Sequence, residues 1–225
     1  MKKLELSDEQ HSEVSKKSKT KKLIPMTSVY TFRYAEMLNK AGFKHIKIPS
    51  THCANETLIR KYLLLGFKVI ISTGGHEINE VSKIGPLEGI LHCVSTYPTP
   101  PEKASLMRMF DLKKAFPGGK VGLSDHSHYN NKNEVAKLAM VLGASLVEKH
   151  FTMLPYDQTK DGIVSTDFEG LKDLCAFDKL SITDKISKEE DKYTVFNKAL
   201  YGLLKAPQDK EEIDLIKKYI TRWDE

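Results

Sequence analysis

The sequence predicts an α/β protein of the TIM type, a (β/α)8 barrel in which about six of the eight strand–helix units are present. Two observations predict the alternation: short apolar runs recur along the chain, and each is followed by a longer segment of helical period. A third observation favours a barrel over an open doubly wound sheet. Polar side chains follow several separate strands, whereas a doubly wound nucleotide binder usually gathers its contacts on one glycine-rich loop.

The elements follow one another with a regular spacing. A polar segment from Leu6 to Lys19 is compatible with a helix. Six strands are then predicted, in chain order Leu23–Thr27, His45–Pro49, Lys68–Thr73, Gly89–Ser95, Lys120–Ser124 and Ser145–His150. Most of the segments between them end in a glycine, which favours the turn after a helix. Since a complete barrel has eight strands, we expect a strand, a helix and a second strand to be missing from the start of this chain.

The last part of the chain has a different character. The run from Thr166 to Glu169 has the pattern of a capping box and predicts the start of a helix. The Lys- and Glu-rich region from Lys188 to Arg222 predicts two polar-faced helices. We therefore divide the chain into a barrel domain, residues 1–180, and a charged helical extension, residues 181–225.

Composition excludes several classes of protein. The 225 residues, 40% hydrophobic and 29% charged, argue against a disordered chain or a coiled coil. Few arginines and scattered lysines, at a net charge of +5, argue against a nucleic-acid binder. No apolar run approaches the ~20 residues of a membrane span, and three cysteines without a CxxC pair fit neither a disulfide scaffold nor a thiolate zinc site. A cytoplasmic protein without nucleic-acid or membrane partners is the resulting expectation.

Two neighbouring strands end in histidines. In GLSDHSH, Ser124 and His126 share one face of the strand, and in ASLVEKHFT, Glu148 and His150 do the same. We therefore expect the two histidines to converge. Paired neutral imidazoles beside a carboxylate suit a divalent cation that keeps open positions for substrate. A hydrogen-bonded histidine pair at the rim of the core is the alternative.

Two other strand ends carry polar residues. HCVSTYPTPPE holds Tyr97 at the mouth between a strand end and three prolines, although such an aromatic residue can also serve as a loop plug. KIPST places Lys47 and Ser50 at another strand end, where an anion contact and a solvated lysine are both compatible with the sequence. Lys47 also raises the alternative of a Schiff-base aldolase, which requires a hydrophobic setting for the lysine.

Taken together and in this order, KIPS, IISTGG, HCVSTYPTP, VGLSDHS and GASLVEKHFT resemble the sialic acid synthase family, which includes legionaminic and pseudaminic acid synthases. The resemblance runs from about Leu6 to about Leu174. It implies a (β/α)8 barrel that condenses phosphoenolpyruvate with an N-acetylated amino sugar, of the N-acetylmannosamine type, to give a nonulosonic (sialic) acid and phosphate. It also implies a divalent metal cofactor, manganese or magnesium.

The resemblance carries roles to individual residues. It implies that His126 and His150 bind the metal and that Glu148 and Ser124 are catalytic residues beside it. Four further residues match positions that bind phosphoenolpyruvate and two match positions at the sugar. The phosphoenolpyruvate positions are Thr27, Lys47, Ser50 and Ser95, and the sugar positions are Tyr97 and Asp161.

The sequence also departs from the family. The family's first strands, which bring an essential glutamate, and its C-terminal antifreeze-like domain have no counterpart here. Ser95 stands where the family has asparagine, and His52 stands where it has a glutamate at the sugar. The alternatives are a legionaminic or pseudaminic acid synthase, a non-catalytic fragment, and a split subunit that works with a second chain. An open barrel edge would favour a homodimer or a complementing chain as partner.

Overall fold

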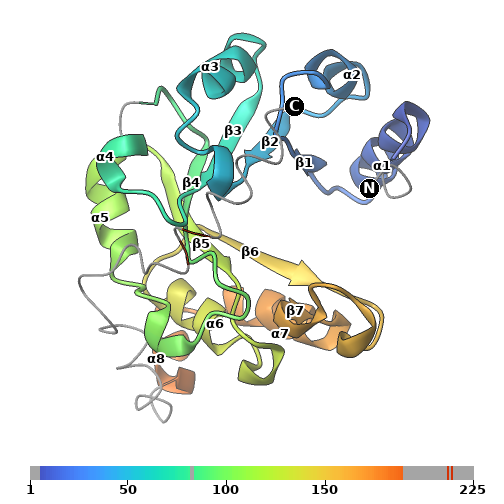
Figure 1. Cartoon of the computed structure of the whole chain (residues 1–225). Helices are drawn as coiled ribbons and strands as arrows, with labels where there is room; N and C mark the ends of the chain where they lie inside the picture. Colours follow the sequence, from blue (N-terminus) through green and yellow to red (C-terminus); the bar gives the residue numbers. More distant parts are fainter. Residues whose placement is uncertain (1–5, 82–83, 190–211, 213, 215–225) are drawn as a thin grey trace.

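Seven parallel strands form one sheet that curves into half of a barrel in the computed structural model, which describes residues 6–81, 84–189, 212 and 214 (Figure 1). The strands lie side by side in chain order, and each pairs in parallel with the next. Within the sheet, β1 and β7 each have a single neighbour, and Figure 1 shows the sheet open between them. The fold is therefore an incomplete α/β barrel, as the sequence predicts, but the described residues form seven strands instead of six, one short of the eight of a complete barrel.

The strands are β1 (Met26–Ser28), β2 (His45–Ile48), β3 (Lys68–Ser72), β4 (Gly89–Cys93), β5 (Lys120–Asp125), β6 (Leu146–Phe151) and β7 (Ser165–Thr166). The sequence predicts the first six apart from their ends, and it misses β7. The strand β7 has only two residues, which is too short to show the alternation of apolar and polar residues that predicts a strand. Because Thr166 pairs with Phe151 in this strand, it is not the predicted helix cap; Asp167 caps the following helix by accepting a hydrogen bond from the Gly170 N–H at 2.8 Å.

The helices are α1 (Asp8–Thr20), α2 (Ala35–Lys40), α3 (Glu56–Leu64), α4 (Ile78–Val81), α5 (Arg108–Ala115), α6 (Glu134–Val141), α7 (Phe168–Asp178) and α8 (Ile182–Glu189). The polar helix predicted at the start is α1, which Ser7 and Gln10 open with a reciprocal capping box. The two helices predicted between Lys188 and Arg222 fall almost entirely outside the described residues. Across the part of the chain that the structure describes, helices are too short or too polar to traverse a lipid bilayer.

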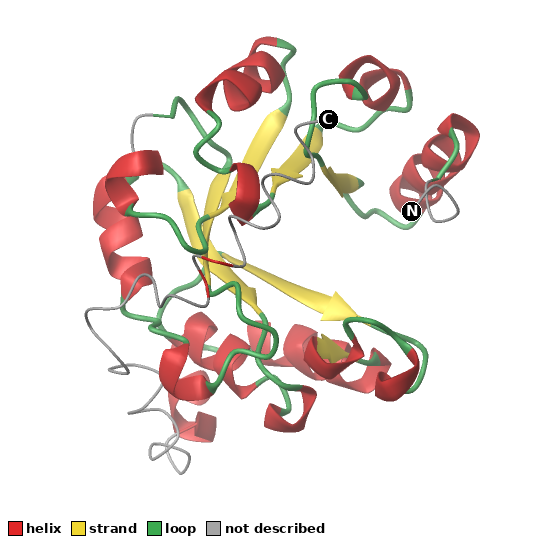
Figure 2. Cartoon of the chain, in the orientation of Figure 1, coloured by secondary structure: helices red, strands yellow, loops and turns green. Residues whose placement is uncertain are grey.

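The hydrophobic core lies between the sheet and the helices on its convex side (Figure 2). Ile46, Val69, Ile71, Ile90 and Val121 supply the sheet side of this core, and all are at most 5% exposed. Because side chains alternate along a strand, the residues between these core positions face the concave side. The concave side, at the carboxyl ends of the strands, therefore receives the polar residues that the sequence singles out.

His92 is a buried polar residue of β4 that faces the core. It is 2% exposed, and its Nε2 donates a hydrogen bond to the Ala104 carbonyl at 2.7 Å, while Nδ1 finds no partner among the described residues. Burial lowers the pKa of His92 from 6.5 to about 4, because a charged ring would lose its hydration there. The folded protein therefore keeps this ring neutral where the unfolded chain protonates it.

We expect His92 to make the free energy of unfolding depend on pH. As the pH falls from 6.5 towards 4, the unfolded chain binds a proton that the folded chain does not, so the stability falls, by up to about 3 kcal/mol at a pH of about 4. Urea unfolding of the native chain and of His92→Gln across this range checks the expectation. The difference in unfolding free energy between the two should change with pH, and a constant difference would contradict it.

Candidate active site

The ends of β5 and β6 bring together four of the predicted site residues. Ser124 and Glu148 are register partners, and the Ser124 hydroxyl donates a hydrogen bond to Glu148 Oε1 at 2.7 Å. Two residues further along each strand lie His126 and His150, whose ring centres are 5.4 Å apart. The two histidines thus converge on the concave side, as strand alternation predicts.

Lys47 reaches this group from the other side of the half-barrel. Its Nζ donates to Glu148 Oε1 at 2.8 Å, and its side chain is 11% exposed. Burial alone would raise the pKa of Glu148, but the Lys47 ammonium and the hydrogen bonds from Lys47 and Ser124 outweigh burial and lower the pKa. Glu148 is therefore an ionised carboxylate. An ammonium held by a carboxylate has no free electron pair, which argues against the Schiff-base alternative at Lys47.

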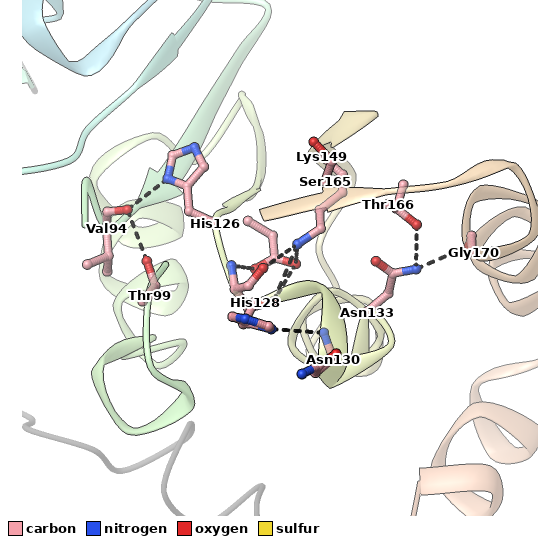
Figure 3. Close-up of polar contacts among 12 residues, drawn as sticks. Val94, Thr99, His126, His128, Asn130, Asn133, Lys149, Ser165, Thr166 and Gly170 are labelled. Atoms are coloured by element: carbon pink, nitrogen blue, oxygen red, sulfur yellow. Dashed lines mark hydrogen bonds and ion pairs between the residues drawn. The ribbon is translucent and has the colours of Figure 1, made fainter. Parts of the chain in front are cut away.

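The proton on His126 is fixed by its surroundings. Its Nδ1 lies 2.8 Å from the Val94 carbonyl oxygen, a contact drawn in Figure 3. Because a carbonyl oxygen accepts and does not donate, Nδ1 carries the proton and Nε2 presents its electron pair. Burial lowers the pKa of His126, and burial together with the charge of a protonated His126 lowers the pKa of His150. Both rings are therefore neutral at neutral pH.

Tyr97 lies between the two imidazoles. Its hydroxyl is 2.7 Å from His126 Nε2 and 3.4 Å from His150 Nε2, and its ring stacks on His126 with centroids 4.0 Å apart. Burial raises the pKa of Tyr97, so the hydroxyl keeps its proton and donates it. Asp161 lies at the same place, with Oδ2 3.9 Å from His150 Nδ1. The two residues predicted at the sugar thus join the histidine pair.

The position of the two histidines shows how they could hold the divalent metal that the family resemblance implies. The Nε2 atoms of His126 and His150 both face the Tyr97 hydroxyl, which a cation bound there would displace. The hydrogen bond to the Val94 carbonyl fixes the tautomer of His126, as hydrogen bonds to the other ring nitrogen do for metal-bound histidines. Within the described ranges, no group of three or more His, Cys, Asp or Glu side chains could hold a metal ion. His126 and His150 together form an incomplete set of ligands for a divalent cation, which would leave coordination positions for water and substrate.

Ser50 and Ser95 follow β2 and β4, and their hydroxyls meet at Gly74, which follows β3, the strand between them. The Gly74 N–H donates to Ser50 Oγ at 3.0 Å, and a Cβ added to Gly74 would lie 2.2 Å from Ser95 Oγ. Gly74 is therefore required by the close approach of both hydroxyls. The Ser95 N–H donates to the Glu212 carboxylate at 2.7 Å, and Glu212 is 3% exposed. This corner of the site thus already holds a carboxylate.

Thr27 is the one predicted site residue that the structure does not bring to this group. It is the register partner of Ile46, which belongs to the core on the convex side. Ser28 is the register partner of Lys47 and so faces the concave side. Sequence reasoning also missed Gly74 and Glu212. The STGG run at the end of β3 carried a signal for Gly74, whereas the sequence holds no signal for Glu212.

Comparison with known proteins identifies the family. The sequence model of the NeuB family matches residues 1–181. The chain belongs to the NeuB family. The resemblance to sialic acid synthases is thereby confirmed, and the whole of the described sheet falls within the matched part of this NeuB chain.

Two curated relatives and one solved structure are similar to this NeuB chain. N,N'-diacetyllegionaminic acid synthase of Campylobacter jejuni is 32% identical over 77% of this chain and 54% of its own length. N-acetylneuraminate-9-phosphate synthase of Drosophila melanogaster is 30% identical over 76% of this chain and 47% of its own length. The crystal structure of the spore coat polysaccharide biosynthesis protein SpsE of Bacillus subtilis has a TM-score of 0.77 and 26% identity, over 93% of this chain and 60% of that one.

The NeuB chain spans about half the length of the curated relatives it matches. The names of the two relatives contain different acids at nearly equal identity, 32% and 30%. The family is therefore shown, and the sugar substrate is not resolved by similarity.

Proposed function

We propose that this chain carries the active site of a nonulosonic acid synthase, which condenses phosphoenolpyruvate with an N-acetylated amino sugar of the N-acetylmannosamine type and releases phosphate. One observation carries the proposal: a largely buried cationic side chain, a backbone N–H that binds a carboxylate and two neutral imidazoles lie at the ends of β2, β4, β5 and β6 on the same concave side. An acid substrate and a polarised carbonyl need these groups close together. The names of the two relatives support the same class of product.

The residues divide into two ends of one site. At the acid end, Lys47 and the Ser95 N–H neutralise and orient the carboxylate and phosphate of phosphoenolpyruvate, with Ser50 as a further hydrogen-bonding hydroxyl. Glu148, ionised and bonded to Ser124 and Lys47, holds Lys47 in place and is positioned to accept a proton. These roles require the carboxylate to stay charged, in agreement with its lowered pKa.

At the other end, His126 and His150 would hold a divalent cation, manganese or magnesium, which supplies Lewis-acid chemistry at the aldehyde oxygen of the sugar. Tyr97 and Asp161 orient the sugar beside it through a hydroxyl donor and a carboxylate acceptor. In the balanced reaction, carbon 3 of phosphoenolpyruvate forms a bond to the aldehyde carbon as the aldehyde C=O π bond opens, and the aldehyde oxygen takes up a proton released by the water that adds next. Water adds at carbon 2, and phosphate leaves with its carbon–oxygen bond broken.

We also propose a division of the chain into two parts. Residues 1–180 are the barrel domain and residues 181–225 are its extension. We place the reaction in the cytoplasm, where a reducing environment suits the free cysteines Cys53, Cys93 and Cys175.

The decisive experiment measures inorganic phosphate released from phosphoenolpyruvate by the 225-residue chain in the presence of Mn²⁺. A panel of N-acetylated hexosamines, including the sugars that lead to sialic, legionaminic and pseudaminic acids, is compared with a reaction without sugar. Sugar-dependent release that EDTA abolishes supports the proposal, and the preferred sugar separates the alternatives. A folded chain that releases no phosphate with any sugar would argue against an active synthase.

A second candidate function is a subunit that needs a complementing chain. The observation that favours it is the pair of sheet edges at β1 and β7, together with the apolar residues Leu23 and Ile24 before β1, which are 63% and 68% exposed. An unpaired strand edge beside apolar surface is a template for another strand. If the chain alone is inactive, adding the segment of a NeuB relative that supplies the eighth strand should restore phosphate release, and size-exclusion chromatography with light scattering separates this complex from a homodimer.

Glu212 gives a prediction within the proposed function. Its carboxylate uses the Ser95 N–H that an acid substrate would need, so Glu212→Gln should lower the KM for phosphoenolpyruvate about fivefold and leave kcat unchanged. The exposed neighbour Asp214 supplies the control, since Asp214→Asn should change neither constant. An unchanged or raised KM in Glu212→Gln would show that Glu212 does not compete at this corner.

A further inference from the structure

A buried ion pair lies behind the two histidines. Asp125 and Lys149 are register partners on the opposite face of β5 and β6, and Lys149 Nζ lies 2.9 Å from Asp125 Oδ2. The lysine side chain is 5% exposed and the aspartate side chain 2%. Burying two charges costs free energy, and apolar residues of similar volume often replace such pairs with no loss of stability. Stability alone therefore does not explain why these charges lie here.

Ser127 extends the ion pair into the turn that follows β5. Its N–H donates to Asp125 Oδ1 at 2.8 Å and its hydroxyl donates to Asp125 Oδ2 at 3.1 Å. Lys149 also donates to the Ser127 carbonyl at 3.0 Å, and Figure 3 shows the Lys149 side chain running from its strand to these contacts. We call these three residues the Asp125 cluster. It joins the end of β5, the end of β6 and the turn between β5 and α6.

Each histidine lies next to a member of the Asp125 cluster in the chain. His126 stands between Asp125 and Ser127, and His150 follows Lys149. On the side of β5 that faces β4, the His126 carbonyl accepts a hydrogen bond from the Thr99 N–H at 2.8 Å. A slip of one residue between two strands turns every side chain to the other face, so whatever fixes the register also fixes the two imidazoles.

We propose that the Asp125 cluster positions His126 and His150 by fixing the register of β5 and β6 and the turn after His126. Its members are positioning residues, since they lie behind the site and act through the histidines. The catalytic consequence rests on the proposed function, but the orientation of the rings does not depend on it.

The test uses variants that separate positioning from stability. Lys149→Met leaves Asp125 buried without its partner and should destabilise the fold. The double variant Asp125→Leu with Lys149→Met removes both charges and should unfold in urea near the native midpoint. If it does not fold, Asp125→Asn with Lys149→Gln takes its place. The control is Lys137→Met. It breaks the ion pair that another buried lysine, in α6, makes with Asp173 of α7 at 2.7 Å.

Two readouts decide the outcome. The first is the tautomer of His126 in the metal-free protein, read from the nitrogen chemical shifts of its ring. The second is the affinity for Mn²⁺, read from the electron paramagnetic resonance of the free ion. We expect the double variant to lose the fixed Nδ1–H tautomer and about tenfold in Mn²⁺ affinity, whereas Lys137→Met keeps both.

A stable double variant with the native tautomer and native Mn²⁺ affinity would overturn the proposal. The proposed function can fail separately. If the native chain shows the fixed tautomer but neither binds Mn²⁺ nor releases phosphate, the synthase assignment fails, and the ring signals of the double variant still decide the role of the Asp125 cluster.

Discussion

Replacing either His126 or His150 with alanine is expected to abolish sugar-dependent phosphate release, with a loss of at least about a hundredfold. The two Nε2 atoms both face the Tyr97 hydroxyl, and each ring would supply one of the two metal ligands proposed among the described residues. Removing one leaves a single ligand, which cannot retain a divalent cation against water, so the several kcal/mol that a metal contributes at a polarised carbonyl are lost. The measurement is phosphate release against Mn²⁺ concentration.

The control for this prediction is another histidine of the same loop. His128 accepts a hydrogen bond from the Asn130 N–H through its Nδ1, and its ring stacks on Tyr129. His128→Ala should keep its activity and its Mn²⁺ dependence. Retention of native activity by both His126→Ala and His150→Ala would remove the metal assignment.

Replacing Lys47 with methionine is expected to reduce phosphate release by at least about a hundredfold and to destabilise the fold. The variant removes the cation proposed to hold the acid substrate and leaves the half-buried Glu148 carboxylate with the Ser124 hydroxyl but without its cationic partner. The pKa of Glu148 should then rise, because burial is no longer outweighed by the ammonium. Phosphate assays and urea unfolding measure the two effects separately.

The double variant Lys47→Met with Glu148→Gln distinguishes charge from packing at this position. It removes the unpaired carboxylate, so stability should return while activity stays lost. The exposed pair between Lys68 and Glu88 supplies a control, since Lys68→Met should affect neither. Borohydride added with substrate tests the aldolase alternative, because a Schiff base at Lys47 would be trapped as a covalent adduct; we expect none.

Strand alternation made part of this site predictable. Ser124, His126, Glu148 and His150 lie on adjacent parallel strands, so a period of two and a shared direction are enough to bring them together. The same rule shows why Thr27 is misplaced. The assignment of Thr27 comes from the family resemblance and not from the strand pattern. The register pairs Thr27 with Ile46 on the core face, whereas Ser28, one residue later, faces the concave side.

The contacts that depend on the curvature of the sheet were beyond sequence reasoning. Lys47 and Glu148 are 101 residues apart, and Ser95 and Glu212 are 117 apart, so no local pattern links them. The sugar is unpredictable for a different reason. Relatives of nearly equal identity have names that contain different acids, and the loop that carries Asp161 has no regular period.

The ion pair between Lys47 and Glu148 has a mechanical consequence. It joins β2 to β6, which are separated by three strands in the sheet. The ion pair therefore crosses the concave side of the half-barrel and connects two strands that do not pair with each other. A sheet with two unpaired edges lacks the closure that fixes the shape of a full barrel. Here a bond across the arc, made by the same charges that would bind substrate, limits how far the sheet can flatten. An acid ligand that binds Lys47 breaks its ion pair with Glu148, and the contacts of the ligand then connect the two sides of the sheet. Binding at the site and the curvature of the sheet are therefore coupled.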